Sequence, residues 1–326
     1  MNNRSAIGAV SVAILLFVLW LLSWWVSREP ALLIEEIQQS TRQQEGNKVV
    51  GYTTTTALIR VTETLLNKSG GYMSNDVLPP FSVLDNMPAW EFGVLEMSRD
   101  LVLAFRKDFS RSQSQSAENV FLKIAQPQLN IDHRSWVLPS AESEYRKAIG
   151  QLYLYRSALV DPKKTDSQFY ARADNLRDWL KNVEKRLGSY SQRLSASVGQ
   201  ERFNTDLAGD ATARQSTFSP DKRVVKTSWW KLDDEFYEAR GATWALLHYL
   251  KAIEVDFADV LARRNAMVSL QQIIRELEAT QQPIWSPMVL NGSGFGVLAN
   301  HSLVMANYIS RANAALIDLS ELLTQG

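Results

Sequence analysis

Residues 169–194 read FYARADNLRDWLKNVEKRLGSYSQRL and set the class of fold for this chain. The apolar side chains in this stretch recur at alternating steps of four and three residues: Phe169, Ala173, Leu176, Leu180, Val183, Leu187, Tyr190 and Leu194. This heptad spacing lines the side chains up along one stripe of a helix, which can pack at a shallow angle against another helix. The stretch therefore predicts a long helix of a helical bundle.

Two more stretches carry similar spacing. The first starts near Trp229, stops at Pro283, and has apolar residues at Leu246, Leu250, Ile253, Phe257, Val260, Met267, Ile274 and Leu277. A continuous helix of some 50 residues would be about 75 Å long, so we expect an elongated bundle or a kink near Arg263, Arg264 and Asn265, where the spacing lapses. The second has apolar residues at Leu298, Met305, Ile309, Ala312, Leu316, Leu319 and Leu323.

Three long apolar stripes in one chain can bury one another in an antiparallel arrangement. The sequence therefore predicts an all-α protein built as an elongated helical bundle. One alternative stays open: part of a stripe could instead serve a partner chain or a second copy in a homo-oligomer.

Residues 6–26, AIGAVSVAILLFVLWLLSWWV, contain no charged side chain. About 20 apolar residues in a helix cross the hydrocarbon core of a bilayer, and tryptophans favour the headgroup region. Trp24 and Trp25 also occupy the place where a signal peptidase would need small residues. We therefore expect an uncleaved transmembrane anchor that inserts in the lipid bilayer.

The flanking charges predict the orientation of this anchor. Arg4 and the free amine precede it, whereas Glu29, Glu35 and Glu36 soon follow, which favours a cytoplasmic N-terminus. We expect residues 1–5 in the cytoplasm and residues 27–326 in the periplasm as an all-α domain of a single-pass inner-membrane protein. The polar connection at 203–226 is a candidate sub-division of that domain.

Composition narrows the function classes. Lysine plus arginine and aspartate plus glutamate are each 35, so no basic excess points to nucleic acid. The chain has no cysteine, and its three histidines lack the spacing of a metal site. No nucleotide fingerprint is met. We therefore expect no metal and no cofactor.

An irregular, proline-rich connection at 72–88 and a glycine-rich turn at 291–296 are the candidate recognition elements. Long connections of this kind are often functional, and a glycine-rich turn before a helix can hold an anion. Both also have a plainer interpretation as turns and as side chains packing the bundle end. The candidate binding residues are Tyr72, Asn75, Asp76, Trp90, Gly292, Gly294 and Gly296.

Two acids, Asp85 and Glu91, lie among aromatic residues in the same region. Glycoside cleavage needs a pair of carboxylates, one as acid and one as base or nucleophile. Asp85 and Glu91 are therefore weak catalytic candidates for a peptidoglycan- or polysaccharide-active hydrolase or lyase. Aspartates beside prolines also commonly form turns.

Several segments resemble a family of unknown function: Gly70–Asp76, Leu84–Gly93, Asp108–Ser114, Phe236–Gly241 and Asn291–Gly294. That family consists of single-pass inner-membrane proteins from gammaproteobacteria, and the resemblance covers nearly the whole chain. It implies a bacterial envelope setting and brings no activity, substrate or catalytic residue.

Together these features favour a membrane-anchored, non-catalytic scaffold or adaptor of a cell-envelope assembly, which binds an envelope protein. The hydrolase or lyase is the alternative. A sensory domain that signals through a separate partner is a third interpretation.

Overall fold

The structure is a computed structural model that describes residues 3–42, 49–77, 84–113, 115–164, 167–203, 222–286, 288–293 and 296–325; for residues 3–9, 202 and 223 it describes the backbone alone. Helices dominate these residues: α1 (Asn3–Val26), α2 (Ile34–Arg42), α3 (Tyr52–Asn67), α4 (Asn86–Ala104), α5 (Val120–Leu129), α6 (Ala141–Val160), α7 (Ala173–Ser195), α8 (Leu232–Asp256), α9 (Ala258–Arg263), α10 (Met267–Thr280) and α11 (His301–Thr324). A π-helical turn, Phe105–Phe109, extends α4, and short 3-10 turns cover Ala196–Val198 and Trp229–Lys231.

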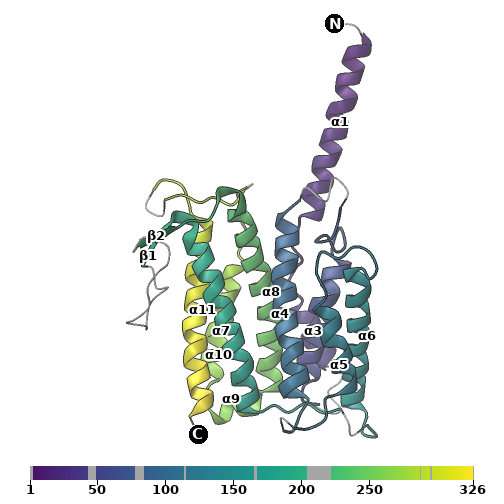
Figure 1. Cartoon of the computed structure of the whole chain (residues 1–326), viewed down its shortest axis with the longest axis vertical. Coiled ribbons are helices and arrows are strands. Elements are labelled where there is room, and N and C mark those ends of the chain that lie inside the picture. The colour runs from purple at the N-terminus through teal and green to yellow at the C-terminus, as the bar shows by residue number, and fades with distance from the viewer. Residues whose placement is uncertain are drawn as a thin grey trace, which may run out of the picture.

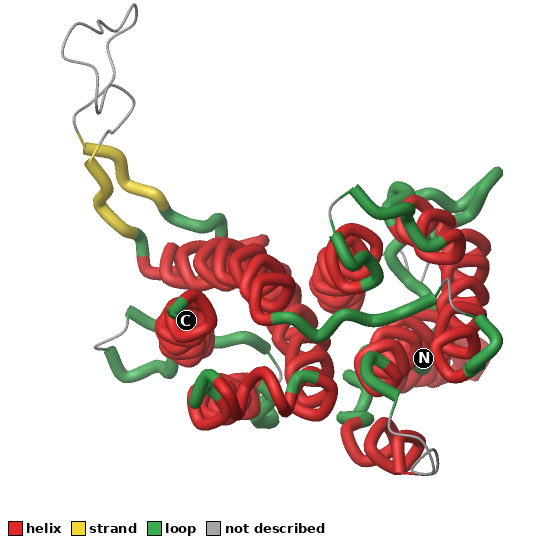
Figure 2. The backbone as a smooth tube through the Cα atoms, turned by 90° about the horizontal axis from the view of Figure 1, so that it is seen from below, coloured by secondary structure: helices red, strands yellow, loops and turns green. Residues whose placement is uncertain are grey.

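The long helices run along a common axis, with α4 and α8 at the centre (Figure 1). Helices α3, α5 and α6 lie on one side of this central pair, and α7, α10 and α11 lie on the other (Figure 2). Helix α1 projects from one end, which we call the α1 end, and the C-terminus lies at the far end (Figure 1). The prediction of an all-α helical bundle is confirmed.

The two central helices cross with their backbones in contact at Gly93 of α4 and Gly241 of α8. A Cβ on Gly93 would lie 2.0 Å from the Glu238 carbonyl oxygen, and one on Gly241 would lie 2.0 Å from the Trp90 carbonyl oxygen. Beside this crossing, the rings of Trp90 and Trp244 pack with centroids 5.1 Å apart. The absence of side chains at both glycines is what allows so close an approach.

Helix α7 is the helix that the heptad spacing predicted, and most of its apolar stripe lies in the protein core. Leu176, Leu180, Val183, Leu187, Tyr190 and Leu194 are all buried, mainly against α11. Phe169 is an exception, because it lies in the connection before the helix and joins an aromatic cluster at the far end. Its ring centroid is 5.4 Å from that of Phe105, 5.2 Å from that of Phe109 and 5.8 Å from that of Phe257.

The stretch from Trp229 to Pro283 is not one continuous helix, and a break lies at the place where a kink was the alternative, near Arg263, Arg264 and Asn265. Helix α8 ends at Asp256, α9 makes a short turn at the far end, and α10 runs back against α8 (Figure 1). The Asp256 carboxylate accepts hydrogen bonds from the Thr54 amide (2.7 Å) and hydroxyl (2.6 Å) at the start of α3. Asn265, where the spacing lapses, has a φ of 52° and reverses the chain.

Helix α11 buries the predicted residues from Met305 to Leu323, but Leu298 does not belong with them. It lies before the helix, whose N-cap is Asn300, and is 65% exposed. The apolar spacing in the sequence therefore continues backward beyond the N-cap, Asn300, where the helix itself begins.

The connection at 203–226 holds a feature that the sequence did not suggest. Strands β1 (Gln200–Phe203) and β2 (Lys222–Val225) pair antiparallel, with Gln200 opposite Val225. The hairpin joins α7 to α8 at the α1 end (Figure 1). The remainder of the connection, 204–221, lies outside the described residues.

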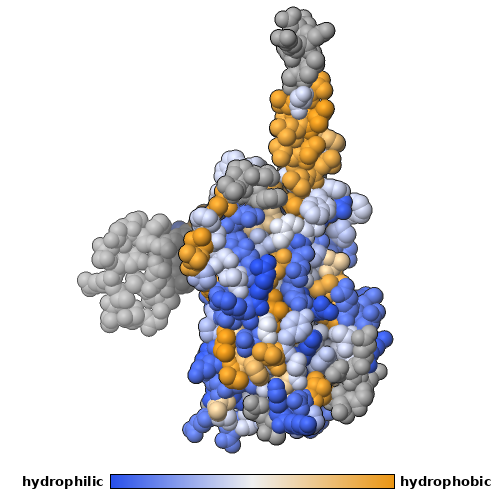
Figure 3. All heavy atoms as spheres, turned by 90° about the vertical axis from the view of Figure 1, so that its right-hand side faces the viewer, coloured by the Kyte–Doolittle hydropathy of each residue, from blue (hydrophilic) through white to orange (hydrophobic). Residues whose placement is uncertain are grey.

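Helix α1 covers the predicted anchor. Among the described residues, no helix combines the length and the apolar composition that a membrane crossing requires, so the transmembrane anchor is not confirmed. The side chains described from Val10 to Trp25 are mostly exposed and apolar (Figure 3), whereas Val26 is buried against the bundle.

The glycine crossing predicts a sharp contrast between alanine substitutions. Gly93→Ala or Gly241→Ala should lower the free energy of unfolding by about 1–3 kcal/mol, because the added methyl meets backbone atoms that must move. Gly150→Ala, at an exposed position of α6 with no atom within 4 Å of its Cβ, should raise it by about 0.5–1 kcal/mol. Urea unfolding of the full chain in detergent micelles measures all three. Equal effects at the three positions would contradict the backbone contact.

Candidate functional site

The segment after α1 is fastened to the bundle by a buried arginine. Arg240 of α8 donates from Nε to both Glu29 carboxylate oxygens at 2.7 Å. Its Nη1 donates to the carbonyl oxygens of Thr280 (3.0 Å) and Gln282 (2.8 Å), and its Nη2 donates to that of Gln281 (3.3 Å). One guanidinium thus binds the end of α10, where a cation is favoured by the helix dipole, and the residues that follow α1.

His248, also on α8, makes a second contact with the segment that follows α1. Its Nε2 accepts a hydrogen bond from the Leu33 amide at 2.9 Å, and its Nδ1 lies 2.7 Å from the Trp244 carbonyl oxygen. The ring must therefore be neutral, with its proton on Nδ1. Burial lowers the pKa of His248 to about 4, which keeps it neutral at physiological pH. The sequence predicted a core or boundary histidine here but could not show its partner.

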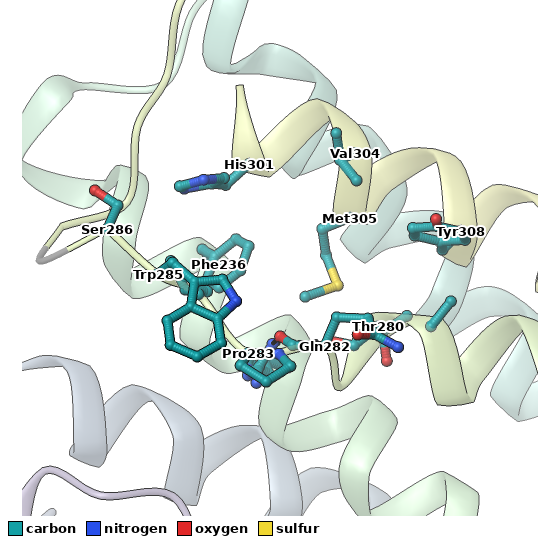
Figure 4. A pocket seen from close by; sticks show the side chains of 13 residues that line it. Phe236, Thr280, Gln282, Pro283, Trp285, Ser286, His301, Val304, Met305 and Tyr308 are labelled. Atoms are coloured by element: carbon teal, nitrogen blue, oxygen red, sulfur yellow. Dashed lines mark hydrogen bonds between the residues drawn. The ribbon is translucent and has the colours of Figure 1, made fainter. Parts of the chain in front are cut away.

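A cavity of about 320 Å³ lies near this junction, between α8, α10 and the start of α11 (Figure 4). Most of its lining is apolar, and His301 and Arg240 are among its polar neighbours. Its volume falls at the lower end of the range for small-molecule pockets. Phe236, Ile284, Trp285, Val304, Met305 and Tyr308 supply most of the apolar surface. This mostly apolar lining suits an apolar group. Sequence reasoning missed it, because the walls from α8 are brought by the fold against the end of α10, the connection that follows it and the start of α11.

Glu91, a predicted catalytic acid, is fully enclosed at the α1 end. Its carboxylate accepts hydrogen bonds from the amides of Met73 (2.9 Å) and Ser74 (2.8 Å) and from the Ser74 hydroxyl (2.5 Å). The Lys68 ammonium lies 2.6 Å from it and also donates to the Gly71 carbonyl oxygen. Burial raises the pKa of Glu91, and Lys68 opposes that rise. Glu91 thus holds the connection after α3 onto α4 and has no access to solvent.

Asp85 and Asp76 differ from Glu91 because both are exposed. The Asp85 side chain caps α4 by accepting from the Asn86 amide at 3.0 Å. Partial burial raises the pKa of Asp76, and the nearby Glu142 carboxylate adds to that rise. Asp85 and Glu91 are therefore placed in different environments, one capping a helix in solvent and one buried in an ion pair, and do not form a shared acid–base site.

The other candidates in this region make contacts inside the protein. Tyr72 donates from its hydroxyl to the His133 carbonyl oxygen at 3.0 Å. Asn75 donates from Nδ2 to the Ser135 carbonyl oxygen (2.9 Å) and to the Glu142 carboxylate (2.8 Å). Trp90 is fully buried. Tyr72 and Asn75 thus tie the α3–α4 connection to the α5–α6 connection, whereas Trp90 packs in the core of the bundle.

The glycine-rich turn is likewise held by its own hydrogen bonds. The Gly292 amide donates to the Ala299 carbonyl oxygen at 3.0 Å, and Asn300 donates from Nδ2 to the Gly292 carbonyl oxygen at 2.6 Å. A Cβ on Gly292 would lie 2.3 Å from the Leu298 carbonyl oxygen, and one on Gly296 would lie 2.6 Å from the Ser293 hydroxyl. Gly294 lies outside the described residues.

Among the residues that the structure describes, no group of three or more histidine, aspartate or glutamate side chains is placed to hold a metal ion. The candidate site is therefore the junction of α1 with the bundle, together with the apolar cavity beside it.

One family model matches this chain over residues 2–326, and its description is an uncharacterized protein conserved in bacteria (DUF2333). No curated protein and no solved structure matches the chain.

The neutral His248 predicts that stability falls in mild acid. Its pKa of about 4 in the folded protein lies below the value of about 6.5 in the unfolded chain, so acid protonates the unfolded state first. The contribution is complete above pH 6.5 and should fall by about 3 kcal/mol as pH drops to 4. Urea unfolding between pH 7 and pH 4 measures this slope.

His248→Gln should flatten that slope, although it lowers stability at pH 7. His301→Gln, at the cavity, should leave the steep slope in place. If both variants keep the wild-type slope, His248 does not carry the acid sensitivity.

Proposed function

The chain belongs to the DUF2333 family of bacterial proteins, and on this premise we propose that it is a non-catalytic, membrane-anchored scaffold of the cell envelope. Helix α1 is the anchor, and the bundle presents binding surfaces beyond the membrane. The observation that carries the proposal is the contrast between α1 and the other described helices, because among them α1 alone stands clear of the bundle with apolar side chains around it (Figures 1 and 3).

The exposure of α1 supports its role as an anchor. Ile14, Leu15, Leu16 and Phe17 are each 57–60% exposed, and Trp20 is 60% exposed. A cluster of large apolar side chains of this size is stable in lipid and unfavourable in water. Arg28 stacks over the Trp24 ring at 3.7 Å, as expected where a helix leaves the hydrocarbon for the headgroups.

The junction supports the scaffold role. Glu29 and Leu33 are both bound to α8, so the bundle is held to the anchor by fixed contacts instead of a loose linker. Helix α11, with 24 residues, is about 36 Å long. A rigid body of that length carries its far end well away from the bilayer.

The setting that we propose is the inner membrane of a gammaproteobacterium, with the bundle in the periplasm. Arg4 before the anchor and Glu29, Glu35 and Glu36 after it favour that orientation. The proposed partner is another envelope protein bound by the bundle. The geometry gives no support to the hydrolase alternative, because Glu91 is enclosed and Asp85 caps a helix.

Arginine substitutions in α1 test the anchor. Leu15→Arg combined with Val18→Arg should release the chain from membranes into the alkaline carbonate supernatant, because each arginine at the helix centre costs about 2.5–3.5 kcal/mol of insertion free energy. The matched control is Leu154→Arg combined with Val268→Arg, which changes exposed apolar residues on the bundle. The control should stay in the membrane pellet. Wild-type chain in the supernatant would refute the anchor.

Cross-linking tests the scaffold. The full-length chain, captured from cross-linked and gently solubilised membranes, should bring down one recurring protein in near-equal amount. A phosphatase fused to the C-terminus, active only outside the cytoplasm, reports the orientation. Turnover of purified cell-wall glycan by the captured chain would instead favour the enzyme and overturn the scaffold.

A further inference from the structure

The tryptophans of this chain are divided between the core and one end of the molecule. Of the ten, Trp90, Trp179 and Trp244 are buried in the bundle. The other seven are at least half exposed: Trp20, Trp24 and Trp25 on α1, and Trp136, Trp229, Trp230 and Trp285 on the bundle. Since all ten lie in described residues, the division covers every tryptophan of the chain.

The four exposed tryptophans of the bundle come from three separate connections. Trp136 lies between α5 and α6, Trp229 and Trp230 lie between β2 and α8, and Trp285 lies between α10 and α11. All three connections are at the α1 end (Figure 1). Segments far apart in sequence therefore present the same residue type to the same side.

Other large apolar side chains accompany these tryptophans. Leu138 is 94% exposed and Val297 is fully exposed, and Val137, Met288 and Leu298 are more than half exposed. We call these residues the apolar rim: Trp136, Val137, Leu138, Trp229, Trp230, Trp285, Met288, Val297 and Leu298. At the far end, the exposed apolar residues include Val50, Val120 and Val268.

We propose that the apolar rim inserts into the headgroup region of the same bilayer that α1 crosses. This inference rests on the proposed function, because α1 must first place the α1 end at a membrane. Tryptophan is the residue that favours the membrane–water interface, where its ring is in contact with acyl chains and its N–H with headgroups. Trp24 and Trp25 mark the same interface on α1 itself.

The charge beside the rim suits a lipid surface. Lys226 and Lys231 are exposed next to Trp229 and Trp230, whereas Lys222 on β2 pairs with Glu201 at 3.4 Å. Anionic lipid headgroups attract lysines that lie within a Debye length of the surface. A bilayer therefore accounts for the tryptophans, the aliphatic side chains and the lysines together, and for their position around the exit of α1.

Since the chain has no cysteine, single-cysteine labelling can locate the rim. Val297→Cys and Leu138→Cys place an environment-sensitive fluorophore on the rim, and Val268→Cys and Val120→Cys place it at exposed positions of the far end as controls. Each full-length variant is reconstituted into vesicles of phosphatidylcholine and phosphatidylglycerol, with or without lipids spin-labelled near the headgroup.

The rim labels should emit at shorter wavelengths than the far-end labels and should lose intensity when the spin-labelled lipid is present. The far-end labels should emit as in water and keep their intensity. Flotation of the same vesicles reports separately whether α1 has inserted.

Three outcomes would overturn the inference. Rim labels that emit as in water, on chains that float with the vesicles, refute rim insertion and leave the anchor intact. When the same labelled chains are also placed in native membrane vesicles, rim labels that shift there but neither shift nor are quenched in the synthetic vesicles would assign the rim to a protein partner. Far-end labels that are quenched equally would show that the bundle lies flat on the surface. Chains that do not float refute the proposed anchor itself.

Discussion

The backbone contact between α4 and α8 at Gly93 and Gly241 is the constraint on which the remaining architecture depends. It brings the two central helices close enough for one bundle to form around them. Arg240 is the neighbour of Gly241, so the crossing also fixes where its guanidinium meets Glu29 and the end of α10. His248 lies further along the same helix and binds Leu33. The fastening of α1 is therefore set by the same helix that holds the two sides of the bundle together.

The α1 end reverses the usual distribution of polar and apolar side chains. Glu91, Tyr72 and Asn75 turn inward and bind the connections to one another. Tryptophans and aliphatic side chains in those and neighbouring connections face outward. In water this arrangement is unfavourable, since exposed apolar area is costly and buried polar groups need complete sets of partners. Beside a bilayer the outward side chains gain an apolar environment, and the inward polar groups keep the connections rigid.

The apolar spacing predicted a helix well where one continuous stripe packs mainly against one other helix, as α7 does against α11. It failed at the ends of stripes, because Phe169 and Leu298 fit the period but lie before the residues that start their helices. It joined α8 to α10 because both helices bury the same kind of stripe, and only the short helix α9 and the turn at Asn265 separate them. The candidate site was harder to predict. Glu91 looks like an available acid until Lys68 and the Ser74 hydroxyl, 23 and 17 positions earlier, are seen around it, and the cavity has no local signal at all.

The junction at Arg240 also has a mechanical consequence. A force applied along α1 is transmitted through Glu29 to the guanidinium of Arg240. This side chain belongs to α8 and also binds the last carbonyl groups of α10. Close-packed helices have low compressibility, so the bundle moves largely as one rigid body. In the proposed membrane setting, a change in the tilt of α1, such as a thinner or thicker bilayer would impose, would swing the whole bundle. The displacement would grow with distance from α1 and would be greatest at the far end.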